Sequence, residues 1–141
     1  IYWSVAKWDG KKLGKKVEKL EKIALGAAEQ SKRNLVPNIT LFEKKVDFLA
    51  QLDQFDRIVV AYEESAKEGE SAALIQAVTG LEKGAKLLFI FGPEGGLSPA
   101  EIESFAAKGA VLAGLGPRIL RAETAPLFAL SAVSVVTELM N

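Results

Sequence analysis

The sequence predicts an α/β protein whose mostly parallel sheet is covered by helices on both faces. Three short apolar runs predict the strands, at residues 57–62, 87–91 and 110–115. Segments with helical features separate these runs, and an alternation of strands and helices is typical of parallel sheets. At 141 residues the chain has the length of one domain.

The first third of the chain predicts two helices. Apolar residues recur near helical spacing over residues 12–30, and most lysines of this segment fall on the other face. The turn-forming residues Asn34 and Pro37 follow this helix and end it. Residues 39–42 then predict a short strand, and residues 43–52 a second helix.

The middle of the chain continues the alternation. After the strand at 57–62, residues 63–70 form a charged loop and residues 71–78 a short helix. The continuous apolar run at 87–91 is expected to be a strand buried on both faces.

Ser98, Pro99 and Glu101 have the spacing of a capping box, which predicts the start of a helix. This helix is expected to run to about Lys108 and to stop at Gly109, because glycine suits the left-handed position after a helix. The glycines of the preceding GPEGG segment therefore lie between a strand end and a helix N-terminus.

The last helix is expected from Pro126 to about Met140, with Thr124 placed to cap it. No residue between 125 and 137 is charged. A helix that is apolar all round must be buried on most sides. Either a partner subunit or a tight core within the chain would bury it, and the short chain favours a partner.

The composition excludes several kinds of site. The chain has no cysteine and no histidine, so disulfides, thiolate chemistry, histidine triads and most zinc sites are ruled out. No carboxylate cluster has the spacing of a calcium loop, and no metal is expected. No apolar stretch reaches the ~20 residues that cross a bilayer. A cytoplasmic protein with no membrane partner is therefore expected.

Two glycine-rich turns follow buried strands. The first, GPEGG at 92–96, lacks the lysine of a P-loop and the GxGxxG of a dinucleotide site. The second is GLGPRILRAETA at 114–125. Taken alone, the first is explained equally well as a plain turn. The second, taken alone, is better explained as a capped turn in which Arg121 and Glu123 form a structural ion pair.

The position of the three strand ends favours a ligand site over plain turns. In a parallel sheet the segments 61–65, 91–96 and 115–124 should meet at one edge, which is where open α/β folds bind ligands. None of the three carries a phosphate-binding lysine at the required spacing. A ligand contacted mainly by backbone amides and carbonyls, with an adenine-like ring between the turns, would suit this edge.

These motifs bear a close resemblance to a known family. FGPEGGLSPAEI (91–102) with LGPRILRAETA (115–125) resembles the paired signature of the SPOUT methyltransferases, and more narrowly of the RsmE family. That family methylates N3 of a uridine in small-subunit (16S) ribosomal RNA with S-adenosylmethionine. AAEQSKRNLVPNI (27–39) and SVAKWD (4–9) resemble two further segments of the family, so the resemblance covers nearly the whole chain.

The resemblance implies a C-terminal trefoil knot that forms the cofactor pocket, and a homodimer with the active site at the subunit interface. Family members are longer. Residues 1–141 are therefore expected to be a SPOUT domain that lacks its first strand and helix, and the N-terminal PUA-like RNA-binding domain is expected to be absent from this chain. Ala122 also stands where the family usually has threonine, which removes a hydroxyl contact.

Turn chemistry and resemblance together predict the cofactor site. The residues expected to bind S-adenosylmethionine are Tyr62, Glu63, Gly92, Pro93, Glu94, Gly95, Gly96, Leu115, Gly116, Ile119, Leu120 and Thr124.

Methylation at uracil N3 needs a group that accepts the N3 proton or stabilises the resulting anion. Arg121 is expected to stabilise the anion, and Glu123 to orient the base or take the proton. Glu94 is the second carboxylate candidate, although it can instead hydrogen-bond loop amides.

The end of the first helix is the expected contact with ribosomal RNA or the small ribosomal subunit. Residues 1–47 carry a net charge of +5 and residues 48–141 a net charge of −5, although on charge alone a solvated lysine-rich helix face is the better explanation of this asymmetry. The candidate RNA-binding residues are Gln30, Ser31, Lys32, Arg33 and Asn34.

Two other functions use the same sheet edge. A nucleotide-binding module would prefer ATP or NAD, and the missing phosphate lysine and GxGxxG speak against it. A non-catalytic structural homodimer would bind no cofactor at all.

Overall fold

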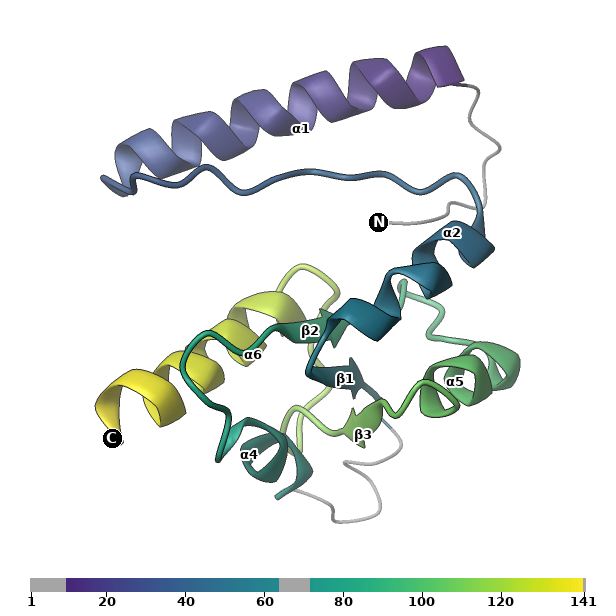
Figure 1. Ribbon diagram of the computed structural model, residues 1–141, viewed down its shortest axis with the longest axis vertical. Coiled ribbons are helices and arrows are strands. Elements are labelled where there is room, and N and C mark those ends of the chain that lie inside the picture. Colours follow the sequence, from purple (N-terminus) through teal and green to yellow (C-terminus); the bar gives the residue numbers. More distant parts are fainter. Residues whose placement is uncertain (1–9, 64–71, 141) are drawn as a thin grey trace. The chain divides into compact units, whose positions relative to one another are not determined.

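The structure is a computed structural model that describes residues 10–63 and 72–140 (Figure 1). The chain divides into two compact units, residues 1–51 and 52–141. Beyond Glu63, the predicted charged loop lies outside the described residues, as does the segment 4–9 that resembles the RsmE family.

The first unit contains the two helices that the sequence predicts. Helix α1 spans Gly10–Gln30 and helix α2 spans Lys45–Ala50. The least exposed side chains of α1 recur every three or four residues along one face, and these are Leu13, Val17, Leu20, Ala24 and Ala28.

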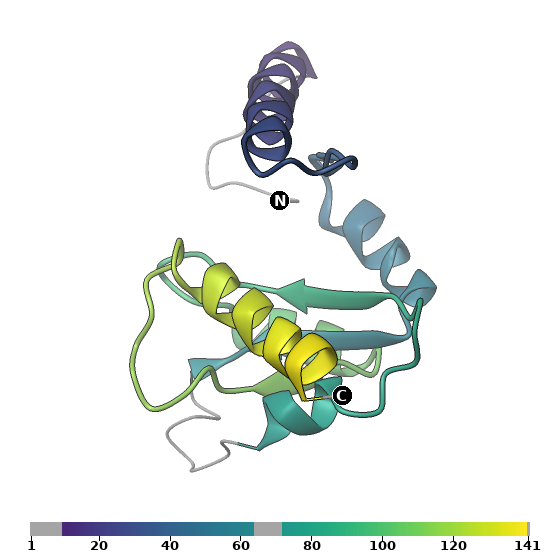
Figure 2. The ribbon, with the colours of Figure 1, turned by 90° about the vertical axis from the view of Figure 1, so that its left-hand side faces the viewer.

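The predicted strand at 39–42 is wrong. Residues 33–42 have no regular hydrogen-bonded structure and return alongside α1 (Figures 1 and 2). A strand needs a neighbouring strand, and the described part of this unit has none. The Phe42 ring instead meets the Phe48 ring of α2 edge to face, with 5.7 Å between the ring centroids.

The second unit contains the predicted parallel sheet. Strands β1 (Arg57–Ala61), β2 (Leu87–Ile90) and β3 (Val111–Ala113) lie in the order β2-β1-β3. Both pairs are parallel, and Val59 of β1 lies opposite residues of both neighbours. The chain therefore adds β2 on one side of β1 and then crosses over to add β3 on the other.

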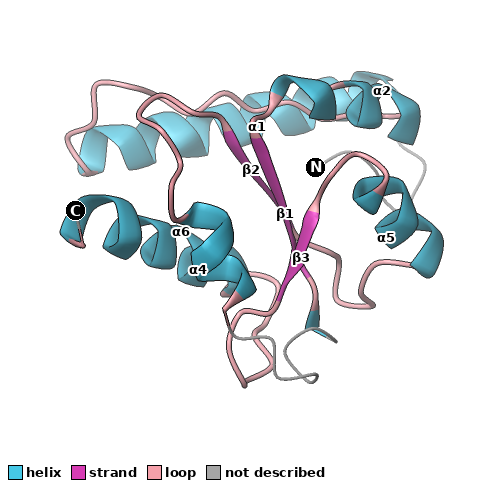
Figure 3. Cartoon of the chain, turned by 60° about the horizontal axis from the view of Figure 1, so that its bottom comes forward, coloured by secondary structure: helices cyan, strands magenta, loops and turns pink. Residues whose placement is uncertain are grey.

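Helices cover both faces of this sheet, as expected. The 3-10 helix η1 (Leu52–Gln54) precedes β1, and helix α4 (Ala73–Val78) connects β1 to β2. Helix α5 (Pro99–Ala106) connects β2 to β3 and lies on the other side of the sheet from α4 and α6 (Figure 3). Helix α6 (Ala125–Ser134) continues as a π-helix, η2 (Val135–Leu139).

The core of this unit lies between the sheet and α4 with α6. Val59, Ala113, Ala77, Val78 and Val136 are buried together there. Successive strand residues point to opposite faces, so the buried neighbours of Val59 in β1 belong to the α5 side.

The expectation that β2 is buried on both faces is wrong for most of the strand. Ile90 is buried, but Leu87, Leu88 and Phe89 are half-buried. The reason is the sheet order, which makes β2 an edge strand and gives the central position to β1. An apolar run does not distinguish these two positions.

The capping box is confirmed in full. The Glu101 N–H donates to Ser98 Oγ (3.3 Å), and the Ser98 N–H donates to Glu101 Oε2 (2.8 Å). Gly109, after the end of α5, has a φ of +78° and so takes the left-handed conformation expected of it.

Replacing Ser98 with alanine is expected to lower the free energy of unfolding by about 1 kcal/mol, because the first amides of α5 lose their acceptor. Ser104→Ala is the matched control. The Ser104 hydroxyl only donates to the Ala100 carbonyl within the helix, and alanine is the better helix former. Urea unfolding of both variants checks this, and equal stability of the two would contradict it.

Candidate active site

A pocket lies where the carboxyl ends of the three strands meet. Its volume is about 450 Å³, and all of its lining residues belong to the second unit. The lining comes from the last residue of β1, the segments after the three strands and the first residue of α6. It consists of Ala61, Tyr62, Glu63, Phe91, Gly92, Pro93, Glu94, Gly95, Gly96, Leu97, Leu115, Gly116, Arg118, Ile119, Leu120, Ala122 and Ala125.

The sheet topology explains why the pocket forms at this edge. The chain leaves β1 toward β2 on one side and reaches β3 on the other, so the segments after the strands diverge and leave a crevice. Beyond the last paired strand residues, the Tyr62 N–H donates to the Ala113 carbonyl oxygen (3.0 Å). This bond holds the segment after β1 against the end of β3.

The GPEGG turn forms one wall. The Gly96 N–H donates to the Pro93 carbonyl oxygen (2.8 Å), and Gly96 has a φ of +77°, which favours glycine. Gly92 is required for a different reason. A Cβ at Gly92 would lie 3.0 Å from Leu97 Cγ and 3.2 Å from the backbone of Gly96 and Leu97.

The segment after β3 forms the opposite wall. Gly116 turns the chain with a φ of +85°, and Arg118, Ile119 and Leu120 follow it along the pocket. The Ile119 side chain is exposed although it is apolar. An exposed aliphatic side chain beside a pocket can pack against a flat ring of a ligand.

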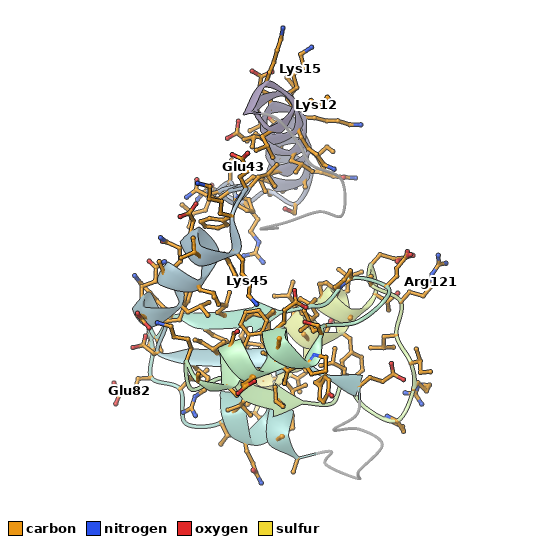
Figure 4. The ribbon with its side chains drawn as sticks, turned by 90° about the vertical axis from the view of Figure 1, so that its right-hand side faces the viewer. Lys12, Lys15, Glu43, Lys45, Glu82 and Arg121 are labelled. Atoms are coloured by element: carbon orange, nitrogen blue, oxygen red, sulfur yellow. The ribbon has the colours of Figure 1, made fainter. Side chains whose placement is uncertain are left out.

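Two of the predicted catalytic residues lie outside the pocket lining. Arg121 and Glu123 form an ion pair, with 3.1 Å between Arg121 Nε and Glu123 Oε1, and their side chains are 83% and 62% exposed. Figure 4 shows Arg121 projecting outward from its loop. The ion pair that the sequence offered as the plainer explanation is therefore present. Glu94, the third candidate, lines the pocket.

The prediction that Thr124 caps the last helix is wrong. Thr124 precedes α6, but its hydroxyl makes no capping hydrogen bond. Its φ and ψ of −88° and −36° are helical, whereas a capping side chain needs an extended backbone to reach the next amides. Thr124 is also absent from the pocket lining.

The candidate RNA-binding residues surround the end of α1, and all five are exposed. The Arg33 N–H donates to the Ala28 carbonyl (2.9 Å) and the Lys32 N–H to the Glu29 carbonyl (3.1 Å), which is a Schellman motif. Lys32 occupies its left-handed position with a φ of 55°, where glycine is usual. The Ser31 hydroxyl donates to the Ala27 carbonyl (2.8 Å) and so completes this helix end.

Several lining residues are not among those predicted from the sequence. Ala61 and Phe91 lie within the segments 61–65 and 91–96 that were expected to meet at this edge, but neither was named as a cofactor contact. Leu97 could not be predicted from these segments, because its place depends on how closely the turn approaches Gly92.

Residues 10–63 and 72–140 contain no group of three or more side chains able to hold a metal ion. Within the same residues, no helix is long and apolar enough to cross a membrane.

The profile of the RNA methyltransferase domain family matches residues 1–134. The chain belongs to this family. It is 53% identical over 138 residues to the ribosomal RNA small subunit methyltransferase E of Bacillus subtilis, and the match covers 98% of this chain and 54% of the relative. The resemblance to RsmE proteins is therefore confirmed.

Solved structures support the same family assignment. A crystal structure described as an hypothetical protein has a TM-score of 0.88 and 47% identity, and the match covers 99% of this chain and 55% of that one. The ribosomal RNA small subunit methyltransferase E of Neisseria gonorrhoeae, solved with bound S-adenosyl methionine, has a TM-score of 0.70 and 25% identity, covering 97% and 54%. The chain spans about half the length of the relatives it matches.

Proposed function

We propose that this RNA methyltransferase domain transfers a methyl group from S-adenosylmethionine to N3 of a uridine in small-subunit ribosomal RNA, in the cytoplasm. The pocket formed by the two glycine-rich turns carries the proposal, because its lining includes eleven of the twelve residues predicted for the cofactor. The names of the relatives support the substrate, and the cofactor bound to the Neisseria protein supports the methyl donor.

The lining residues fit this cofactor chemically. S-adenosylmethionine has no phosphate, and no lysine lines the pocket. Glu63 and Glu94 are the two lining carboxylates, and either can accept hydrogen bonds from the ribose hydroxyls or the amino group. The apolar side chains of Leu115, Ile119 and Leu120 can flank the adenine ring. The backbone amides and carbonyls of the turns can then hydrogen-bond to the edge of the ring.

When bound, the cofactor supplies a methyl group that is already activated for displacement. The protein must therefore position the base and accept the N3 proton. We assign Arg121 to stabilise negative charge on the uracil carbonyl oxygens and Glu123 to accept the proton, directly or through a water. Their ion pair keeps the two groups within reach of a single base.

The proposal includes the homodimer and the C-terminal knot of the SPOUT proteins. Apolar side chains of α6 and η2 support the homodimer, because Leu127, Leu130 and Leu139 are largely exposed. Exposed apolar surface of this kind marks an interface. A partner subunit beside α6 would also enclose the exposed loop that carries Arg121 and Glu123.

Leu130→Asp is expected to convert the dimer to monomers in sedimentation velocity, because it buries a carboxylate at the interface. Leu130 is 64% exposed, so the subunit itself should stay folded. Ile75→Asp, at an exposed apolar position of α4, is the control and should stay dimeric. A wild-type monomer, or a Leu130→Asp dimer, would contradict the proposed interface.

Isothermal calorimetry with S-adenosylmethionine, its demethylated product, ATP and NAD tests the cofactor. Binding of the first two alone supports the methyltransferase. Preference for ATP or NAD would favour the nucleotide-binding module, and absence of all binding would favour the structural homodimer.

A further inference from the structure

The solvent-facing side of α1 carries a concentrated positive charge. With 100° per residue, five of its lysines fall in a sector of about 120° that contains no carboxylate of the helix. We call this sector the lysine face. All five side chains are exposed, and they are Lys12, Lys15, Lys16, Lys19 and Lys22.

The lysine face lies opposite the apolar stripe of α1. Its centre, near Lys19, is about 140° from the centre of the stripe that contains Leu13 and Ala24. Figure 4 shows Lys12 and Lys15 projecting away from the helix. The face extends over about 15 Å of helix, long enough to meet several phosphates of one nucleic-acid strand.

This arrangement is unfavourable for the protein alone. Lys15 and Lys19 are like charges four residues apart, and such a pair destabilises a helix by about 0.2–0.5 kcal/mol. A bound polyanion removes the repulsion.

The end of α1 extends the same charge. Lys32 and Arg33 are exposed there, and Lys32 adopts a left-handed backbone that costs a residue with a side chain about 1 kcal/mol. Backbone strain of this kind concentrates at functional sites.

We propose that the lysine face of α1 is an electrostatic docking surface for the phosphate backbone of the RNA substrate. This inference rests on the proposed function and adds a surface that lies outside both the pocket and the helix end Gln30–Asn34. Lysines contact phosphates as mobile point charges, so the face holds the RNA without reading its sequence.

The test replaces the centre of the face. Lys15→Gln, Lys19→Gln and Lys22→Gln are combined in one variant, and glutamine keeps nearly the helix propensity of lysine. The control combines Lys44→Gln, Lys83→Gln and Lys86→Gln, three other exposed lysines, and changes the net charge equally. Binding to transcribed 16S ribosomal RNA is measured by fluorescence anisotropy between about 0.05 and 0.2 M KCl.

The face variant is expected to reduce the slope of log K against log salt by about 2, as three lost phosphate contacts require. At 0.15 M salt its affinity should fall roughly tenfold to fiftyfold, while the control stays within about threefold of wild type. S-adenosylmethionine binding should be unchanged in both variants.

The same slope and affinity in both variants would overturn the inference, and so would RNA binding lost equally in both. Binding of the wild type to anionic phospholipid vesicles in preference to RNA would overturn it in favour of a membrane surface. The proposed function fails separately, if wild-type protein does not methylate the RNA. If the wild type methylates the RNA but the two variants do not differ in RNA affinity or salt slope, only the proposed docking surface is contradicted.

Discussion

Gly92→Ala is expected to weaken S-adenosylmethionine binding by about tenfold to a hundredfold. The added methyl group would lie 3.0 Å from Leu97 Cγ and 3.2 Å from the backbone of Gly96 and Leu97. Overpacking of this kind costs about 1–3 kcal/mol, and relief requires the turn to move away from the pocket. Calorimetry measures the loss.

Gly95→Ala is the control for this prediction. It makes the same change in the same turn, but its methyl group meets no atom within 4 Å and its φ is not in the left-handed region. Its affinity for S-adenosylmethionine should stay within about threefold of wild type. If Gly92→Ala bound as tightly as Gly95→Ala, the GPEGG turn would not be a wall of the cofactor site.

Arg121→Ala and Glu123→Ala are each expected to lower kcat for RNA methylation by about a hundredfold or more. Loss of one charge-stabilising donor or one general base has effects of this size. Cofactor binding should be unchanged, because neither residue lines the pocket. Single-turnover methylation with saturating cofactor and RNA separates the chemical step from binding.

Neither substitution is expected to unfold the protein, so a lower kcat cannot be attributed to lost stability. The ion pair between Arg121 and Glu123 is largely exposed, and surface pairs contribute about 0–1 kcal/mol. Arg121→Lys keeps the charge but not the planar guanidinium, so it should recover part of the lost rate. Full turnover by Glu123→Ala with intact cofactor binding would remove Glu123 from the mechanism.

Local chemistry made much of this fold predictable. The capping box before α5 needs only Ser98, Pro99 and Glu101 at fixed spacing, and all of its hydrogen bonds are present. The left-handed Gly109 follows from the same local rules. The pocket was predictable because parallel strands bring their carboxyl ends to one edge, which required no knowledge of side-chain packing.

The errors concern properties that local sequence does not determine. Residues 39–42 have strand-like side chains, but a strand exists only when another lies beside it. The apolar run of β2 is compatible with a central or an edge position, and the crossover to β3 decided between them. Thr124 has a capping side chain on a backbone whose dihedrals prevent capping.

The candidate catalytic residues were likewise predictable only in part. The spacing of Arg121 and Glu123 predicted their ion pair correctly. Their position outside the pocket lining depends on the course of the whole loop after β3, so the sequence could not give it. The close approach of Leu97 to Gly92 is likewise a tertiary contact.

Reverse transcription of small-subunit ribosomal RNA tests the central claim most directly. A methyl group at uridine N3 blocks base pairing and stops the polymerase. The stop should be present in RNA from the wild-type strain, absent after deletion of the gene, and restored by the wild-type gene but not by one encoding Arg121→Ala. A stop that persists unchanged in the deletion strain would contradict the proposed reaction.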